Sequence, residues 1–146
     1  AAGLKPVVIG DPYGIGKLRE GDLCRPGVMA EDDYPTWPLI KWAAETKNHM
    51  EEPIIVLQPT SPLRSVSDIR GCIELFETHG TAAVTSAYRN HPNGAVYIRY
   101  AEQMHDRWMA LMYNMPWQRS ADIDTTEDFD EAEKVYNAQH PVPLEF

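Results

Sequence analysis

Short apolar runs alternate along this chain with segments in which apolar residues recur at helical spacing. The runs predict buried strands, because a strand covered on both faces reads as a continuous apolar stretch. They occupy residues 5–10, 53–57, 82–86, 95–100 and 109–113. The periodic segments predict α-helices with one apolar face; they occupy residues 36–48, 68–79, 101–107 and the region after 125. Strands separated by helices indicate an α/β fold.

Residues that favour helix ends mark two of these helices more closely. We expect Ser67 to cap the helix at 68–79, which Gly80 then ends. Thr125 and Asp128 have the spacing of a capping box, in which each residue's side chain bonds the other's backbone amide. The last helix is therefore expected to begin directly after Thr125.

This order of elements predicts a mixed, mostly parallel sheet with helices on both faces, in a single domain that spans residues 1–146. In an open sheet of this kind, ligands bind beyond the carboxyl ends of the strands. Residues 11–16 and 58–64 each follow a predicted strand, so we expect both segments at that edge.

Charge and cysteine content narrow the classes of function. The 146 residues include 22 acidic and 13 basic side chains, for a net charge of −9, which disfavours binding to a nucleic-acid backbone. Cys24 and Cys72 fit no metal or redox spacing, so we expect reduced thiols in a cytoplasmic protein. No apolar run approaches the ~18 residues of a membrane span, so we expect no membrane partner.

The loop at residues 57–64, LQPTSPLR, is the first candidate for chemistry. Its two prolines stiffen the backbone, and Gln58, Thr60 and Ser61 offer short polar side chains. Arg64 offers a planar fork that suits a carboxylate or a phosphate. The same residues would equally suit a rigid turn between a strand and a helix, with hydroxyls that cap the helix.

The second candidate is SADIDT, at residues 120–125. In an extended segment Asp122 and Asp124 point to the same side, roughly 7 Å apart. Paired carboxylates at this spacing suit a Mg²⁺ ion that keeps several waters and contacts substrate phosphates. The alternative is that Asp124 or Thr125 caps the last helix while Asp122 is solvated.

Two further segments carry weaker signals. Asn93-Gly94 before an apolar run predicts a turn, with Tyr97 half-buried beyond it. The glycine-rich segment 10–18 departs from a phosphate-binding loop, because five residues separate Gly10 from Gly16 and a leucine replaces the Ser or Thr that binds magnesium. We interpret it as a glycine-rich turn.

Three of these segments, taken in order, resemble the CMP-sialic acid synthetase family. They are LQPTSPLR at 57–64, NGAVYI at 93–98 and SADIDTTEDFDEAE at 120–133. The resemblance implies a Rossmann-like nucleotidyltransferase fold and Mg²⁺-dependent transfer of CMP from CTP to a sugar acid, with release of pyrophosphate.

The resemblance also implies roles for individual residues. Asp122 and Asp124 would hold the metal, and Gln58 would hydrogen-bond the sugar acid. Asn93 and Tyr97 would line the sugar pocket. Arg64 belongs to the motif, and the resemblance leaves open whether it serves the ligand or the fold.

Two parts of the family pattern are missing from this sequence. The family opens with a strand and a loop rich in Arg, Gly, Ser and Lys that grips the triphosphate, and residues 1–20 do not match it. The family's long dimerisation arm, which sends basic residues into the partner's site, is replaced by residues 88–92. The chain then resembles a member truncated at its N-terminus: a shortened homologue, a fragment, or a chain whose mobile loops are left out.

These departures leave more than one function open. Loss of the first strand would expose sheet edges, so we expect either a rearranged sheet or a homo-oligomer that covers them. One alternative is a catalytically inactive homologue that binds a small ligand or serves in assembly, with Asp122 and Asp124 merely solvated. Another is a regulatory domain that binds phosphate through residues 10–17.

Overall fold

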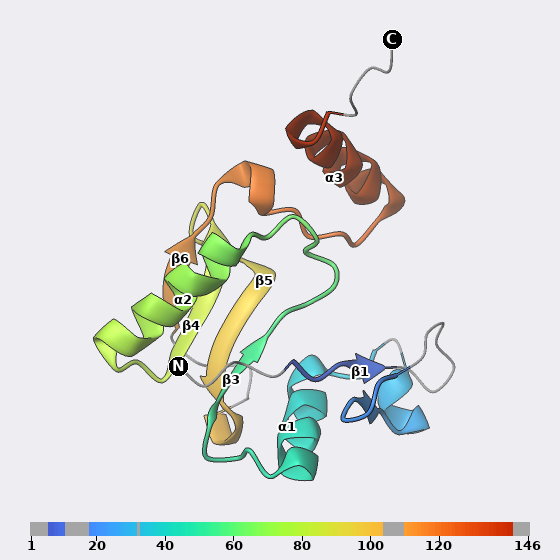
Figure 1. Ribbon diagram of the computed structural model, residues 1–146, viewed down its shortest axis with the longest axis vertical. Coiled ribbons are helices and arrows are strands. Elements are labelled where there is room, and N and C mark those ends of the chain that lie inside the picture. Colours follow the sequence, from blue (N-terminus) through green and yellow to red (C-terminus); the bar gives the residue numbers. More distant parts are fainter. Residues whose placement is uncertain (1–5, 11–17, 32, 104–109, 142–146) are drawn as a thin grey trace.

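The computed structural model describes residues 6–10, 18–31, 33–103 and 110–141. Within them the chain forms an α/β structure with a mixed four-stranded sheet and three α-helices (Figure 1). The strands are β1 Ile9–Gly10, β2 Leu23–Cys24, β3 Pro53–Val56, β4 Ala83–Tyr88, β5 His91–Tyr100 and β6 Leu111–Asn114. The α-helices are α1 Thr36–Lys47, α2 Val66–His79 and α3 Thr126–Gln139, and the 3-10 helices are η1 Gly27–Ala30, η2 Ala101–Gln103 and η3 Trp117–Arg119.

The main sheet has the strand order β3-β5-β4-β6, and β1 and β2 form a separate parallel pair. β3, β4 and β6 run in one direction and β5 runs against them, so the expected mixed sheet is confirmed. The expectation of mostly parallel neighbours is wrong, because β5 lies between β3 and β4 and pairs antiparallel with both. A hairpin, rather than a helical crossover, joins β4 to β5.

The turn of this hairpin is Arg89-Asn90, whose φ angles of 50° and 64° are typical of a type I′ turn. Asn90 and Asn114 join the turn to the end of β6: the Asn90 amide donates to Asn114 Oδ1, and Asn114 Nδ2 donates to Asn90 Oδ1. The turn predicted at Asn93-Gly94 is therefore wrong, since both residues lie inside β5.

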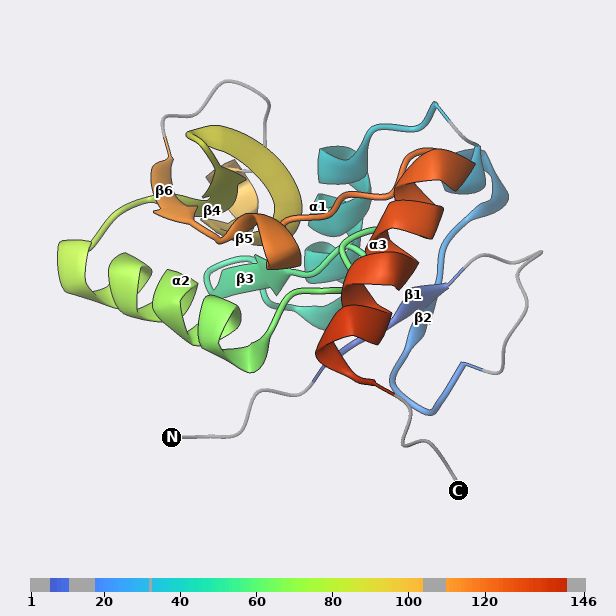
Figure 2. The same cartoon turned by 90° about the horizontal axis from the view of Figure 1, so that it is seen from above.

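Helix α2 covers one face of the sheet and forms the main core with it (Figure 2). The predicted apolar face of this helix is confirmed: Cys72 is fully buried, and Ile69, Ile73 and Phe76 pack beside it. Burial, followed by the charge of Asp68, raises the pKa of the Cys72 thiol to about 12, so the thiol stays protonated. From the sheet and the segment after β6, the core includes Val84, Ala95, Val96, Ile98 and Met115.

Successive residues of a strand point to opposite faces of the sheet. The face of β5 that points away from α2 meets helix α1. The rings of Trp37 in α1 and Tyr97 in β5 pack edge to face, with centroids 5.1 Å apart. The Arg99 guanidinium carbon lies 4.8 Å from the centroid of the Trp37 ring on the same face. The prediction that helices cover both faces of the sheet is thus confirmed at β5, which has α2 on one face and α1 on the other.

Helix α3 lies apart from the four-stranded sheet in both views (Figures 1 and 2). Its predicted capping box is confirmed, because Thr125 Oγ1 accepts from the Asp128 amide and Asp128 Oδ2 accepts from the Thr125 amide. Its predicted apolar face is largely open: Ala132 is buried, but Phe129 and Tyr136 are exposed.

Some predicted elements fall partly outside the described residues. The glycine-rich segment 11–17 and the distal part of the helix predicted at 101–107 lie outside them, and η2 Ala101–Gln103 is the part of that helix that is described. The predicted first strand is reduced to Ile9–Gly10 among the residues described. None of the helices in the described part of the chain has the length and apolar character that a membrane crossing requires.

Helix α2 approaches β6 most closely at Gly71. A Cβ atom at this position would lie 2.2 Å from Cε2 of Tyr113. We expect Gly71→Leu to destabilise the fold by about 1–3 kcal/mol, because the core must open to admit the side chain. Thr78→Leu, at an exposed position of the same helix, is the control for the added apolar bulk. Urea denaturation of both variants measures the effect, and equal stabilities would contradict this packing.

Candidate functional site

Three segments that are far apart in the sequence meet at the carboxyl end of β3. The Ile123 amide donates a 2.8 Å hydrogen bond to the Thr60 carbonyl oxygen, which joins the segment before α3 to the proline-containing loop. The Ser61 hydroxyl, which is fully buried, donates to the Asn93 carbonyl oxygen at 3.3 Å and so joins the same loop to β5. The loop at 58–64 therefore contacts both other segments.

Arg64 holds this loop in shape. Its Nη1 donates to two carbonyl oxygens of the loop, that of Gln58 at 2.5 Å and that of Ser61 at 2.8 Å. The guanidinium is half-buried, and burial lowers its pKa from the usual value. Arg64 thus contributes to the fold of the loop through these two bonds.

A large bulge in β5 brings Asn93 and Gly94 to the site. Between two paired positions β5 advances five residues, from Tyr97 to Pro92, while β4 advances two, from Thr85 to Ala87. The side chain of Ser86 occupies the gap, because its hydroxyl lies 2.6 Å from Asn93 Oδ1 and accepts from the Val96 amide at 2.8 Å. Bulges of this kind redirect a strand next to a binding site.

Asn93, predicted to line a pocket, is instead bonded within the bulge. It is 7% exposed, its Oδ1 bonds to Ser86, and its Nδ2 lies 3.6 Å from Met115 Sδ. Its side chain therefore supports the bulge, its carbonyl oxygen faces the Ser61 hydroxyl, and its neighbour Gly94 faces Gln58 and Asp122.

Gly94 is the point at which the segments converge. Its φ of +74° belongs to the left-handed region, which glycine adopts without strain. A Cβ atom here would lie 2.5 Å from Gln58 Oε1 and 3.0 Å from Asp122 Oδ2. The backbone of β5 therefore lies directly against an amide from one segment and a carboxylate from another.

Asp122 presents an unsatisfied oxygen at this point. Its Oδ1 atom is buried and has no hydrogen-bond partner among the described residues. A buried acceptor that lacks a donor is uncommon in proteins and suits a site that is completed by a bound cation or donor group. Nearby, burial and then the negative charge of Asp122 raise the pKa of Tyr97, although Arg99 acts in the opposite direction. The Tyr97 hydroxyl therefore remains a hydrogen-bond donor at neutral pH.

Asp124, the second predicted metal ligand, is exposed, and its backbone amide donates to Asp128 Oδ2 at 3.2 Å. Within the part of the chain that the structure describes, no three His, Cys, Asp or Glu side chains gather into a metal site. A Mg²⁺ ion held by Asp122 and Asp124 would thus take its remaining ligands from water and substrate phosphates, as this ion commonly does.

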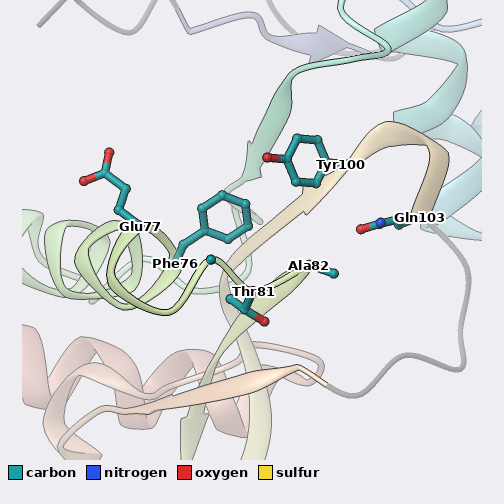
Figure 3. Close-up of a pocket in the computed structure, with 7 residues that line it drawn as sticks. Phe76, Glu77, Thr81, Ala82, Tyr100 and Gln103 are labelled. Carbon is teal, nitrogen blue, oxygen red and sulfur yellow. The ribbon is translucent and has the colours of Figure 1, made fainter.

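Neither of two hollows in the described part of the structure coincides with this site. A hollow of about 390 Å³ lies near the opposite ends of β3 and β4, between Phe76 of α2 and Tyr100 of β5 (Figure 3). A second hollow, of about 340 Å³, shares Tyr100 and Gln103 with it. The residues around Gly94 contribute to neither, so the site rests on the convergence of polar groups rather than on a deep pocket.

Two residues that the sequence did not single out fix the surroundings of the site. Asp68, in the first turn of α2, is fully buried and binds Arg119 of η3 through both carboxylate oxygens, at 2.8 and 2.9 Å. Asp68 also completes a capping box with Ser65, so the predicted cap at Ser67 is wrong by two residues. The Ser-x-x-Asp spacing at 65–68 was the available signal, whereas nothing local marks Arg119 as its partner.

The site thus contains an amide from Gln58 and a carboxylate from Asp122 against the backbone of Gly94. The Tyr97 phenol lies near enough to Asp122 for the carboxylate to raise its pKa. Thr60 and Ser61 hold the loops together through hydrogen bonds to Ile123 and Asn93. No known protein-family model matches this chain.

Gly94→Ala tests the convergence directly. We expect a loss of about 1–3 kcal/mol, because the added Cβ meets the left-handed backbone as well as Gln58 and Asp122. Gly80→Ala is the matched control, since Gly80 also has a positive φ, of +53°, but its Cβ would have open space. Thermal unfolding should show a larger loss at position 94; similar losses would mean that the close contact contributes nothing.

Asp68 should also make stability depend on pH. Burial alone would raise the pKa of this carboxyl, but hydrogen bonds from Arg119 and Ser65 outweigh burial and hold the pKa below the ordinary 3.8. A carboxyl with a lowered folded-state pKa adds stability above its unfolded-state pKa, and that stability is lost as pH falls through the folded-state value.

We therefore expect the free energy of unfolding to fall as the pH drops below about 5. Asp68→Asn should be less stable at pH 7 and should lose less on acidification, because this position no longer titrates. Asp22 and Asp128, whose pKa values are also lowered, are present in both proteins and cancel in the comparison. Urea titrations from pH 7 to pH 2 measure this, and parallel curves would contradict it.

Proposed function

We propose that this protein is a Mg²⁺-dependent nucleotidyltransferase of the CMP-sialic acid synthetase type, with the Rossmann-like fold of that family. The observation that carries the proposal is the meeting of its three motif segments around Gly94. A chance match in sequence would give no reason for Gln58, Gly94 and Asp122 to lie in contact. The position at the carboxyl end of β3 is also where α/β sheets bind ligands.

Asp122 and Asp124 are the residues that would hold the metal, and the unsatisfied Oδ1 of Asp122 fits that role. When bound, Mg²⁺ neutralises charge on the triphosphate. Gln58 and the protonated Tyr97 donate hydrogen bonds to the sugar acid, which orients its hydroxyl toward the α-phosphate. In the transfer, that hydroxyl oxygen bonds to the α-phosphorus, the bond from the α-phosphorus to the bridging oxygen breaks, and pyrophosphate leaves as the hydroxyl proton is lost.

A second candidate is a homologue that binds a ligand, or assembles with other chains as a homo-oligomer, without catalysis. Its support is that Arg64, Ser61 and Asn93 are bonded within the protein rather than presented to a ligand. The retained motifs then maintain the fold of the loops. Neither candidate involves nucleic acid, given the net charge of −9.

Ligand-dependent unfolding tests the proposal. We expect CTP with Mg²⁺, at a concentration ~100 times Kd, to raise Tm by roughly 5 °C or more, because binding to the folded state alone stabilises it. Asp122→Asn combined with Asp124→Asn should abolish the rise. Asp130→Asn, at an exposed position of α3, should retain it and so controls for the loss of negative charge.

Pyrophosphate release from CTP in the presence of sialic acid then separates the two candidates. Release that depends on Asp122 and Asp124 supports the enzyme. A shift of Tm without pyrophosphate release supports the non-catalytic binder. No shift of Tm in the wild type, or an equal shift in the double variant, would refute the metal–nucleotide site.

A further inference from the structure

One buried carboxylate connects the two loops that bring Gln58 and Asp122 together. Asp68 Oδ2 accepts hydrogen bonds from the Ser65 amide at 2.8 Å, the Ser65 hydroxyl at 2.7 Å and Arg119 Nε at 2.8 Å. Asp68 Oδ1 accepts from Arg119 Nη2 at 2.9 Å. The side chain of Asp68 has no exposed surface, so these four donors take the place of water.

The donors come from the two sides of the site. Ser65 directly follows the loop at 58–64, which carries Gln58. Arg119 precedes Asp122 by three residues, and the 3-10 turn at Arg119 is closed by its amide, which donates to the Pro116 carbonyl oxygen. A single carboxylate therefore holds the end of one loop and the start of the other segment.

The same two segments are joined a second time beyond Asp122. The Ile123 amide donates to the Thr60 carbonyl oxygen at 2.8 Å. Asp122 thus lies between two attachments to the proline-containing loop and its helix, one through Arg119 and one through Ile123. Only the short segment from 120 to 122 separates the two attachments, so together they restrict where the Asp122 carboxylate can lie.

The ion pair between Asp68 and Arg119 is better suited to fixing the positions of two segments than to stabilising the fold. Burial of a carboxylate costs solvation energy that an ion pair recovers only in part, so buried ion pairs are weak stabilisers but can fix one arrangement of segments. The guanidinium fork bonds both oxygens of Asp68 in one plane and so sets direction as well as distance. A lysine at this position would supply charge without that fork.

We propose that Arg119 is a positioning residue, whose two-point ion pair with Asp68 fixes the Asp122 carboxylate against the Gln58 loop. The functional meaning of that position rests on the proposed function, but the positioning itself is a property of the protein alone.

Amide hydrogen exchange measured by NMR tests the positioning without any ligand. We expect Arg119→Gln to speed exchange of the Ile123 amide by roughly tenfold or more relative to the Val96 and Ile98 amides in the core, which report global unfolding. Arg119→Lys should give a smaller increase, since one ammonium restores part of the contact. Arg70→Gln, at an exposed position of α2, should change neither and controls for the loss of positive charge.

Ser65→Ala removes a different donor to the same carboxylate. We expect it to speed exchange in the first turn of α2 while Ile123 stays protected, because Arg119 still holds its own segment. If Arg119→Gln does not fold, Arg119→Lys carries the test, with the ratio of Ile123 to Val96 exchange as the readout.

If the Arg119 variants accelerate amide exchange equally at Ile123, Val96 and Ile98, the ion pair contributes only to global stability. This result would overturn the inference. Unchanged exchange at Ile123 would overturn it as well. The response of Tm to CTP and Mg²⁺ is measured on the same variants. If the wild type does not respond, the proposed function fails while the exchange data still decide the positioning; if it responds, Arg119→Gln should weaken the apparent affinity more than Arg70→Gln does.

Discussion

The bulge in β5 is the constraint on which the site depends. A strand buried in the middle of a sheet normally directs its amides and carbonyls into the ladder and offers its backbone to nothing else. Here the Ser86 hydroxyl donates to the Asn93 side-chain oxygen and accepts from the Val96 amide, so it supports β5 where the strand leaves the ladder. The displaced backbone at Gly94 then reaches the Gln58 loop and Asp122. Without these hydrogen bonds to Ser86, β5 could not both lie in the middle of the sheet and form one side of the site.

The sequence predicted the elements better than their relationships. Apolar periodicity placed α2 and its buried face, and the capping-box spacing placed the start of α3, because both signals are local. The hairpin was missed because its turn is Arg89-Asn90, and arginine carries no turn signal, whereas Asn93-Gly94 carries a strong one and lies in a strand. The turn signal fell on Gly94, a residue whose left-handed backbone conformation serves a bulge rather than a turn.

For the site, the sequence identified segments but divided the roles among their residues differently from the structure. Short polar side chains in a motif suit ligand contact and internal bonding equally well, and only the three-dimensional environment separates the two. Arg64, Ser61 and Asn93 bond to backbone or buried groups. Gln58 and Asp122 instead place polar side-chain atoms against Gly94. The pair of Asp68 and Arg119 could not be foreseen, because the two residues are 51 positions apart and the local Ser-x-x-Asp spacing relates Asp68 to Ser65 rather than to Arg119.

This division of roles bears on why these residue types occur together in this chain. The loops that carry Gln58 and Asp122 are held in place by other residues of the same segments, so loss of those residues would disturb the loops with or without a ligand. The presence of Arg64, Ser61 and Asn93 is therefore explained by the fold alone. The Oδ1 of Asp122, which has no hydrogen-bond partner among the described residues, is not, because a buried acceptor that lacks a donor costs free energy. The Asp122 carboxylate lies between two attachments to the neighbouring loop, and its Oδ1 has no partner among the described residues. This feature favours a bound ligand over a purely structural role for the segment.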